Sequence, residues 1–106
     1  MTKLTEKNEA IAKMIGYVSP GLNFNSDANL LMDAISFIQK KNYNIIFAPF
    51  IDDEIGELSG EYWCQILSNN SVNISTNCII DITGQPSNQA AIFEALYQFS
   101  QYFKYF

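Results

Sequence analysis

The stretch that most constrains the fold is the last twenty residues, 87–106, with the sequence SNQAAIFEALYQFSQYFKYF. Apolar residues recur in it at spacings of three and four, the period of one face of an α-helix. This stripe consists of Ile92, Ala95, Leu96, Phe99, Phe103 and Phe106. A helix of this kind has to bury its stripe, so we expect it to anchor the core. Phe93, Tyr97 and Tyr105 lie off the stripe and predict additional aromatic surface, part of it open to a partner.

Two further helices and a set of strands are predicted before it. Residues 4–16 have the pattern of a short helix, and Asn25, Ser26 and Asp27 are a strong helix-start signal for a second one that closes at residues 40–42. Extended runs are expected at 43–50, 62–67 and about 72–82, with a long acidic hairpin loop at 51–61, a turn at 68–70 and a connection at 83–88. Pro49 marks the end of the first run or an edge strand.

Strands joined by such short connections are antiparallel neighbours. The expected fold is therefore α+β, a small antiparallel β-meander with helices packed on its faces, in the order ααβββα. This is an α/β sandwich that forms one domain over residues 1–106, a length sufficient to bury a core without metal or disulfides.

Charge excludes one class of partner. Six lysines, with no arginine and no histidine, stand against eleven carboxylates, for a net charge of −5. A protein that binds long nucleic acid neutralises phosphates with cations, so we expect no such ligand. A small phosphate-bearing molecule remains open, because helix N-termini hold phosphates with few cations.

Cys64 and Cys78 are fourteen residues apart and belong to no CxxC pair, so we expect two buried thiols and no metal site. No apolar run reaches the length of about 18 residues that spans a membrane, and residues 1–8 are polar. These observations predict a cytoplasmic protein without a membrane partner.

Candidate binding residues lie beside the predicted helix starts and among the loop aromatics. They are Tyr17, Phe24, Ser26, Asp27, Ser87, Asn88 and Tyr97. Helix starts expose backbone N–H groups that attract anions, and aromatic rings stack on bases. The same residues also fit ordinary caps and core aromatics, and both interpretations stay open here.

The usual catalytic groups are missing. Without histidine, acid and base catalysis falls to carboxylates such as Asp27, Asp33, Asp81 and Glu94, and no pattern sets two of them at a defined separation. The acidic residues Asp52, Asp53, Glu54 and Glu57 lack EF-hand spacing and fit a solvated loop better than a calcium site. We therefore expect no enzyme, no cofactor and no metal.

Three segments resemble the phage ABA-sandwich domain family, which consists of small phage and prophage proteins. They are NEAIAKMIGY at 8–17, NFNSDANLLMDAISFIQ at 23–39 and AIFEALYQFSQYFKY at 91–105. The chain departs from the family pattern at Asp27, Ala28 and Asn29, where an aromatic is common, and at Asp33, where a proline often follows the methionine. The resemblance implies an α/β sandwich of phage origin in the host cytoplasm and carries no catalytic residues.

The phage context suggests an anti-defence role, in which an oligomer sequesters a cyclic nucleotide immune signal; this is an analogy of context. The alternative is a protein-binding module that inhibits a host protein or assists phage assembly. Its exposed aromatic surface would be formed by Tyr97, Tyr102, Tyr105 and Phe106. Low positive charge favours the second class, and the phage context favours the first.

Overall fold

The computed structural model describes residues 4–18, 21–52, 54, 56–68 and 78–103. These form helices α1 (Leu4–Ile15) and α2 (Ala28–Lys40), strands β1 (Tyr43–Asp52), β2 (Glu57–Ser68) and β3 (Cys78–Gln85), and helix α3 (Asn88–Phe103). The expected α+β class and the order ααβββα are confirmed. The predicted turn at 68–70 and the first part of the third predicted strand lie largely outside the described residues, as do Tyr105 and Phe106.

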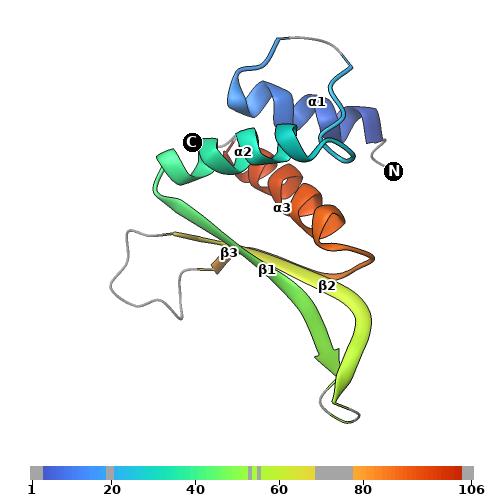
Figure 1. The fold of residues 1–106 in the computed structure, drawn as a ribbon. Coiled ribbons are helices and arrows are strands. Elements are labelled where there is room, and N and C mark those ends of the chain that lie inside the picture. The colour runs from blue at the N-terminus through green and yellow to red at the C-terminus, as the bar shows by residue number, and fades with distance from the viewer. Residues whose placement is uncertain (1–3, 19–20, 53, 55, 69–77, 104–106) are drawn as a thin grey trace.

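The elements form three layers (Figure 1). The antiparallel sheet has the strand order β1-β2-β3. Helix α3 packs on β2 and β3, α2 packs on β1, and α1 lies against α3 on the side away from the sheet. All three helices therefore lie on the same side of the sheet, and its other face is covered by no element of the described chain.

The prediction of an acidic loop over residues 51–61 is wrong for most of that range. Ile51 pairs with Leu58 and Asp52 with Glu57, so β1 and β2 continue almost to the turn. The register shifts just before these pairs, and Gly60 has a φ of 85°, a left-handed conformation that favours glycine. The extra residues on β2 form a bulge there. Figure 1 shows the resulting hairpin extending beyond the helices.

Helix α3 is buried on more than its predicted stripe. Ile92, Leu96 and Phe99 are buried as expected, and Phe93, which lies off the stripe, is buried as well. The reason is the third layer, because a helix with the sheet on one side and α1 on the other buries two faces. Of the off-stripe aromatics that the structure describes, Phe93 is therefore internal and Tyr97 is partly buried.

Polar contacts fasten α1 to the rest of the domain. The buried side chain of Asn8 donates to Asn25 Oδ1 at 2.9 Å, and its own Oδ1 accepts from the Asn25 N–H at 3.4 Å. Lys7 Nζ lies 2.8 Å from Glu94 Oε2 on α3. The amide pair fixes the loop that leads into α2, and the ion pair fixes α1 against α3.

Candidate functional site

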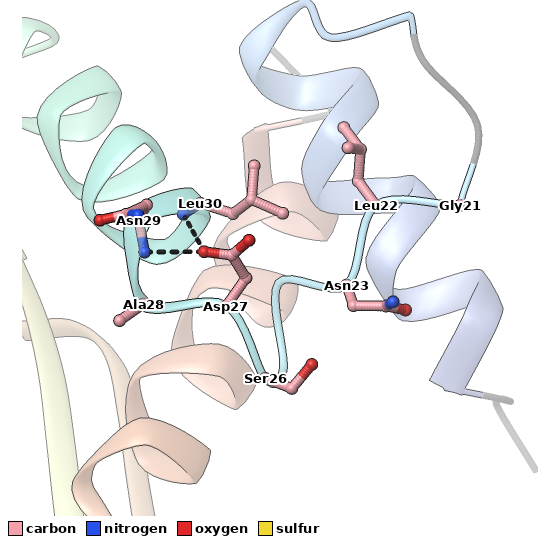
Figure 2. Close-up of a pocket in the computed structure, with 8 residues that line it drawn as sticks. All are labelled: Gly21, Leu22, Asn23, Ser26, Asp27, Ala28, Asn29 and Leu30. Atoms are coloured by element: carbon pink, nitrogen blue, oxygen red, sulfur yellow. Dashed lines mark hydrogen bonds between the residues drawn. The ribbon is translucent and has the colours of Figure 1, made fainter.

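The predicted site residues around the start of α2 line a shallow depression of about 430 Å³ (Figure 2). Its lining is formed by Gly21, Leu22, Asn23, Ser26, Asp27, Ala28, Asn29 and Leu30. Asp27 is the N-cap, and its Oδ1 accepts from the N–H groups of Asn29 at 2.9 Å and Leu30 at 3.3 Å. The carboxylate thus occupies the amides that a phosphate would bind, and it repels an anion as well.

The other predicted residues near this helix start differ in accessibility. The Ser26 side chain is exposed and points away from the Asp27 carboxylate (Figure 2). Phe24 is fully buried in the core and offers no ring face to a base. Tyr17 is exposed, with its ring centroid 6.4 Å from that of Phe24, and its hydroxyl donates to Asp33 Oδ2 at 2.7 Å. This hydrogen bond raises the pKa of Tyr17, and desolvation and the charge on Asp33 raise it further.

The start of α3 is capped by its own side chain too. Ser87 Oγ accepts from the Ala90 N–H at 3.0 Å. Asn88 follows, and its Oδ1 is buried without a hydrogen-bond donor among the described residues. Gln89 lines a groove together with Ala28, so the starts of α2 and α3 lie near each other. Neither helix start leaves its first turn uncapped.

Tyr97 lies elsewhere. It is nine residues beyond Asn88 on the same helix, which is about 13 Å at a rise of about 1.5 Å per residue. Tyr97 is partly buried against the core, and Lys7 Nζ lies 5.3 Å from its ring centroid. The structure therefore brings Tyr17, Ser26 and Asp27 to the region of the α2 start, but Tyr97 faces α1. The seven predicted residues do not line one pocket.

All four carboxylates considered for catalysis have structural partners. Asp27 caps α2, and Asp33 accepts from Tyr17. Asp81 Oδ1 accepts a long hydrogen bond of 3.4 Å from Gln65, and Glu94 pairs with Lys7. No two of these contacts share a residue. These four carboxylates thus serve separate structural contacts.

An apolar groove of about 390 Å³ lies between α2 and β1, and sequence reasoning missed it. It is lined by Ala28, Leu31, Met32, Ile35, Gln39, Ile45, Phe47, Gln89 and Ile92. Met32 is 58% exposed and Phe47 is 43% exposed at its rim, and no charged residue lines it. We call this the α2–β1 groove.

Exposed apolar side chains continue from the groove along β1. Phe50 is 51% exposed and Ile51 is 53% exposed on the hairpin that extends past the helices. The sequence contained a signal for this exposure, because the run YNIIFAPF is apolar on both alternating faces of the strand. Helices cover only one face of this sheet, so apolar side chains on the other face stay exposed. Of the residues predicted to form the aromatic surface of a protein-binding module, Tyr102 is exposed and Tyr97 is partly buried.

The two cysteines differ from each other. Cys64 is buried, and burial raises the pKa of its thiol to about 12, but Cys78 is exposed, so the expectation of two buried thiols is wrong for Cys78. Cys78 is the first residue of β3 and pairs with Leu67, next to a register shift in the sheet, whereas Cys64 belongs to the core cluster. The described residues contain no group of three or more metal-ligating side chains. Among the same residues, no helix has the length and apolar character needed to cross a bilayer.

Comparison with known proteins adds no relative: no family model, no curated protein and no solved structure matches the chain. The resemblance to the phage ABA-sandwich family stays a prediction from three segments of sequence.

Proposed function

We propose that this chain is a non-enzymatic accessory protein that acts by binding another protein through the α2–β1 groove. The observation that carries the proposal is the exposure of Met32 and Phe47 at the rim of an uncharged groove. Large apolar side chains that stay exposed beside a concavity are typical of protein interaction sites. Methionine suits such a surface because its flexible side chain adapts to the shape of a partner.

The chemistry of the groove favours an apolar protein segment over a charged small molecule. Gln39 and Gln89 are the polar side chains in its lining, and neither carries a charge. A phosphate-bearing ligand would need a cation or uncapped amides, which the groove lining lacks. An apolar side chain from a partner would gain contacts with Ile45, Leu31 and Ile92 in the floor.

Absence of catalysis is part of the proposal. Asp33 accepts a hydrogen bond from Tyr17 and Glu94 pairs with Lys7, so each of these carboxylates has a structural contact. A phage origin, an anti-defence role and a place in the host cytoplasm depend on the family resemblance alone. They remain predictions.

Sequestration of a cyclic nucleotide remains the competing prediction. It needs ring faces and phosphate-binding amides that converge on one pocket. Phe24 is buried, and Asp27 and Ser87 accept from the first-turn amides of their helices. The described geometry therefore supports nucleotide binding less well than protein binding.

Photo-crosslinking from the groove tests the proposal. Phe47 is replaced by the photoreactive p-benzoylphenylalanine, the cells that express the protein are irradiated, and adducts are identified by mass spectrometry. The matched control carries the same group at Val18, which is 97% exposed but lies between α1 and α2, away from the groove. We expect a protein adduct from position 47 and not from position 18. Absence of any protein adduct at position 47 would refute the proposal.

A further inference from the structure

The face of the sheet that points away from the helices has its own set of side chains. Side chains alternate between the two faces along a strand. Cys64 and Ile66 of β2 are buried on the helix side, so Trp63 and Gln65 point to the other face. We call this the outer face of the sheet. No element of the described chain covers it (Figure 1).

Trp63 lies at the centre of the outer face. It is on the middle strand and is only partly buried, although it is the one tryptophan of the chain. Its neighbours on the adjacent strands are small, because it pairs with Ala48 on β1 and lies beside a register shift that contains Gly84 on β3. The ring therefore remains accessible to a partner. A large aromatic ring in this position is typical of an interface anchor.

Further apolar side chains extend the outer face towards the hairpin. Ile46, next to buried Ile45, points to this face, and so does Phe50, four residues further along β1. They are 37% and 51% exposed. Ser59 Oγ donates to the Phe50 carbonyl at 3.1 Å and accepts from the Glu61 N–H at 3.1 Å. These two hydrogen bonds hold Phe50 and Glu61 side by side across the bulge.

The charge of the sheet is entirely negative. Residues 43–85 contain six of the eleven carboxylates of the chain and none of its six lysines. Glu61 and Asp81 lie on the outer face, since Tyr62 and Ile82, their neighbours in sequence, pack in the core on the helix side. Both carboxylates are exposed. The described lysines lie on α1 and at the end of α2, so none of them neutralises this face.

We propose that the outer face of the sheet binds a cationic segment of a partner protein, in which arginine or lysine lies beside apolar residues. Charge selects this occupant, because nucleic acid or an anionic membrane would be repelled, and a second copy placed face to face would bring like charges together. The described residues contain no group of three or more metal-ligating side chains, so these carboxylates do not converge on one metal ion. The inference goes beyond the proposed function, because the α2–β1 groove lies on the other side of the sheet.

Arginine fits the arrangement of this face. Trp63 and Glu61 are two residues apart on the same face of β2, a separation of about 7 Å. A guanidinium group is planar, so it can stack on the indole ring while one of its N–H groups donates to a carboxylate. One arginine can therefore contact both residues. Apolar residues next to that arginine would pack on Ile46 and Phe50.

A defined peptide tests the inference, because the fluorescence of the single tryptophan reports on the centre of the outer face. The probe carries arginine and leucine alternately at every second position, with serine between them, so that one face of the extended peptide presents both. In the control peptide, citrulline replaces every arginine, which removes the charge and keeps the shape. We expect the arginine peptide to change the emission of Trp63 saturably, and the citrulline peptide to bind at least about tenfold more weakly. Equal affinity for the two peptides, or no change in emission up to about 1 mM, would overturn the inference.

Substitutions on the chain locate the bound peptide. Glu61→Gln and Asp81→Asn each remove one charge from the outer face with little change of shape, and each should raise the Kd about threefold. The double variant should raise the Kd about tenfold. Glu9→Gln is the matched control, because Glu9 is exposed on α1 and lies away from the sheet. Equal weakening by Glu9→Gln and Glu61→Gln would overturn the inference, since the peptide would then respond only to net charge.

Photo-crosslinking of the purified protein separates the outer face from the groove. We expect p-benzoylphenylalanine at position 63 to form an adduct with the arginine peptide, and the same group at position 47 to form none. An adduct at position 47 alone, or an adduct of position 63 with a second copy of the chain, would overturn the inference. The crosslink from position 47 in cells tests the groove separately, so the inference and the proposed function can fail independently.

Discussion

Replacing Asn8 by alanine removes the buried amide that joins α1 to the loop before α2. The Asn8 side chain is 5% exposed, donates to the Leu4 carbonyl at 3.1 Å and to Asn25 Oδ1 at 2.9 Å, and accepts from the Asn25 N–H at 3.4 Å. A hydrogen bond contributes about 0.5–1.5 kcal/mol net, and a group left buried without its partner costs about 1–3 kcal/mol. Asn25 is only half-buried, so water replaces part of what it loses. We expect Asn8→Ala to lower the free energy of unfolding by about 2–3 kcal/mol.

Urea unfolding followed by far-UV circular dichroism measures this change, and a thermal scan should show a Tm lower by about 10 °C. Glu9→Ala is the matched control, since Glu9 is the exposed neighbour on the same helix. Asn25→Ala removes the other half of the pair, so the double variant should cost at least about 1 kcal/mol less than the sum of the single variants. Strict additivity, or an Asn8→Ala variant within about 0.5 kcal/mol of wild type, would refute the reasoning.

Three further predictions follow from the core, the thiols and the helix starts. Phe99→Ala should lower the free energy of unfolding by about 3–5 kcal/mol in the same assay, because the ring is fully buried and its centroid lies 4.9 Å from that of Tyr43. A decrease of less than about 1 kcal/mol would contradict the central position of Phe99 in the core. Iodoacetamide at pH 8 should alkylate exposed Cys78 well before buried Cys64, whose pKa is raised to about 12, and equal rates by mass spectrometry would disprove that burial. Cyclic dinucleotides, cyclic trinucleotides and cyclic ADP-ribose isomers should leave the Tm unchanged, because Asp27 occupies the α2 amides; stabilisation near 2.7 kcal/mol at 100 times Kd would instead favour sequestration.

The helices could be predicted because their signals are local. Asp27 has the short oxygen-bearing side chain that caps a helix, and the structure shows it accepting from two first-turn amides. The apolar spacing in residues 87–106 predicted α3 for the same reason. The burial of Phe93 was not predictable in this way, because it depends on α1 packing against α3 from a distant part of the chain.

The hairpin shows where local signals mislead. Acidic residues and two glycines over residues 51–61 indicated a loop, yet β1 and β2 pair as far as Asp52 and Glu57. Pairing across two strands outweighs weak intrinsic preference, and Gly60 serves a bulge within the strand. Pro49 gave the right signal, since it lies in an edge strand with its nitrogen facing outward.

The candidate site was the least predictable part, for a physical reason. The side chains that bind anions at helix starts are the same types that cap those helices, so Ser87 and Asp27 fit both roles until their hydrogen bonds are known. The exposed apolar side chains of β1 were also not predictable from the sequence alone. An apolar run such as residues 43–50 suits a buried strand, but it lies at the sheet edge, and the helices end before the hairpin does. Which of its side chains stay exposed is set by the positions of the sheet edge and of the helix ends, and both are properties of the whole fold.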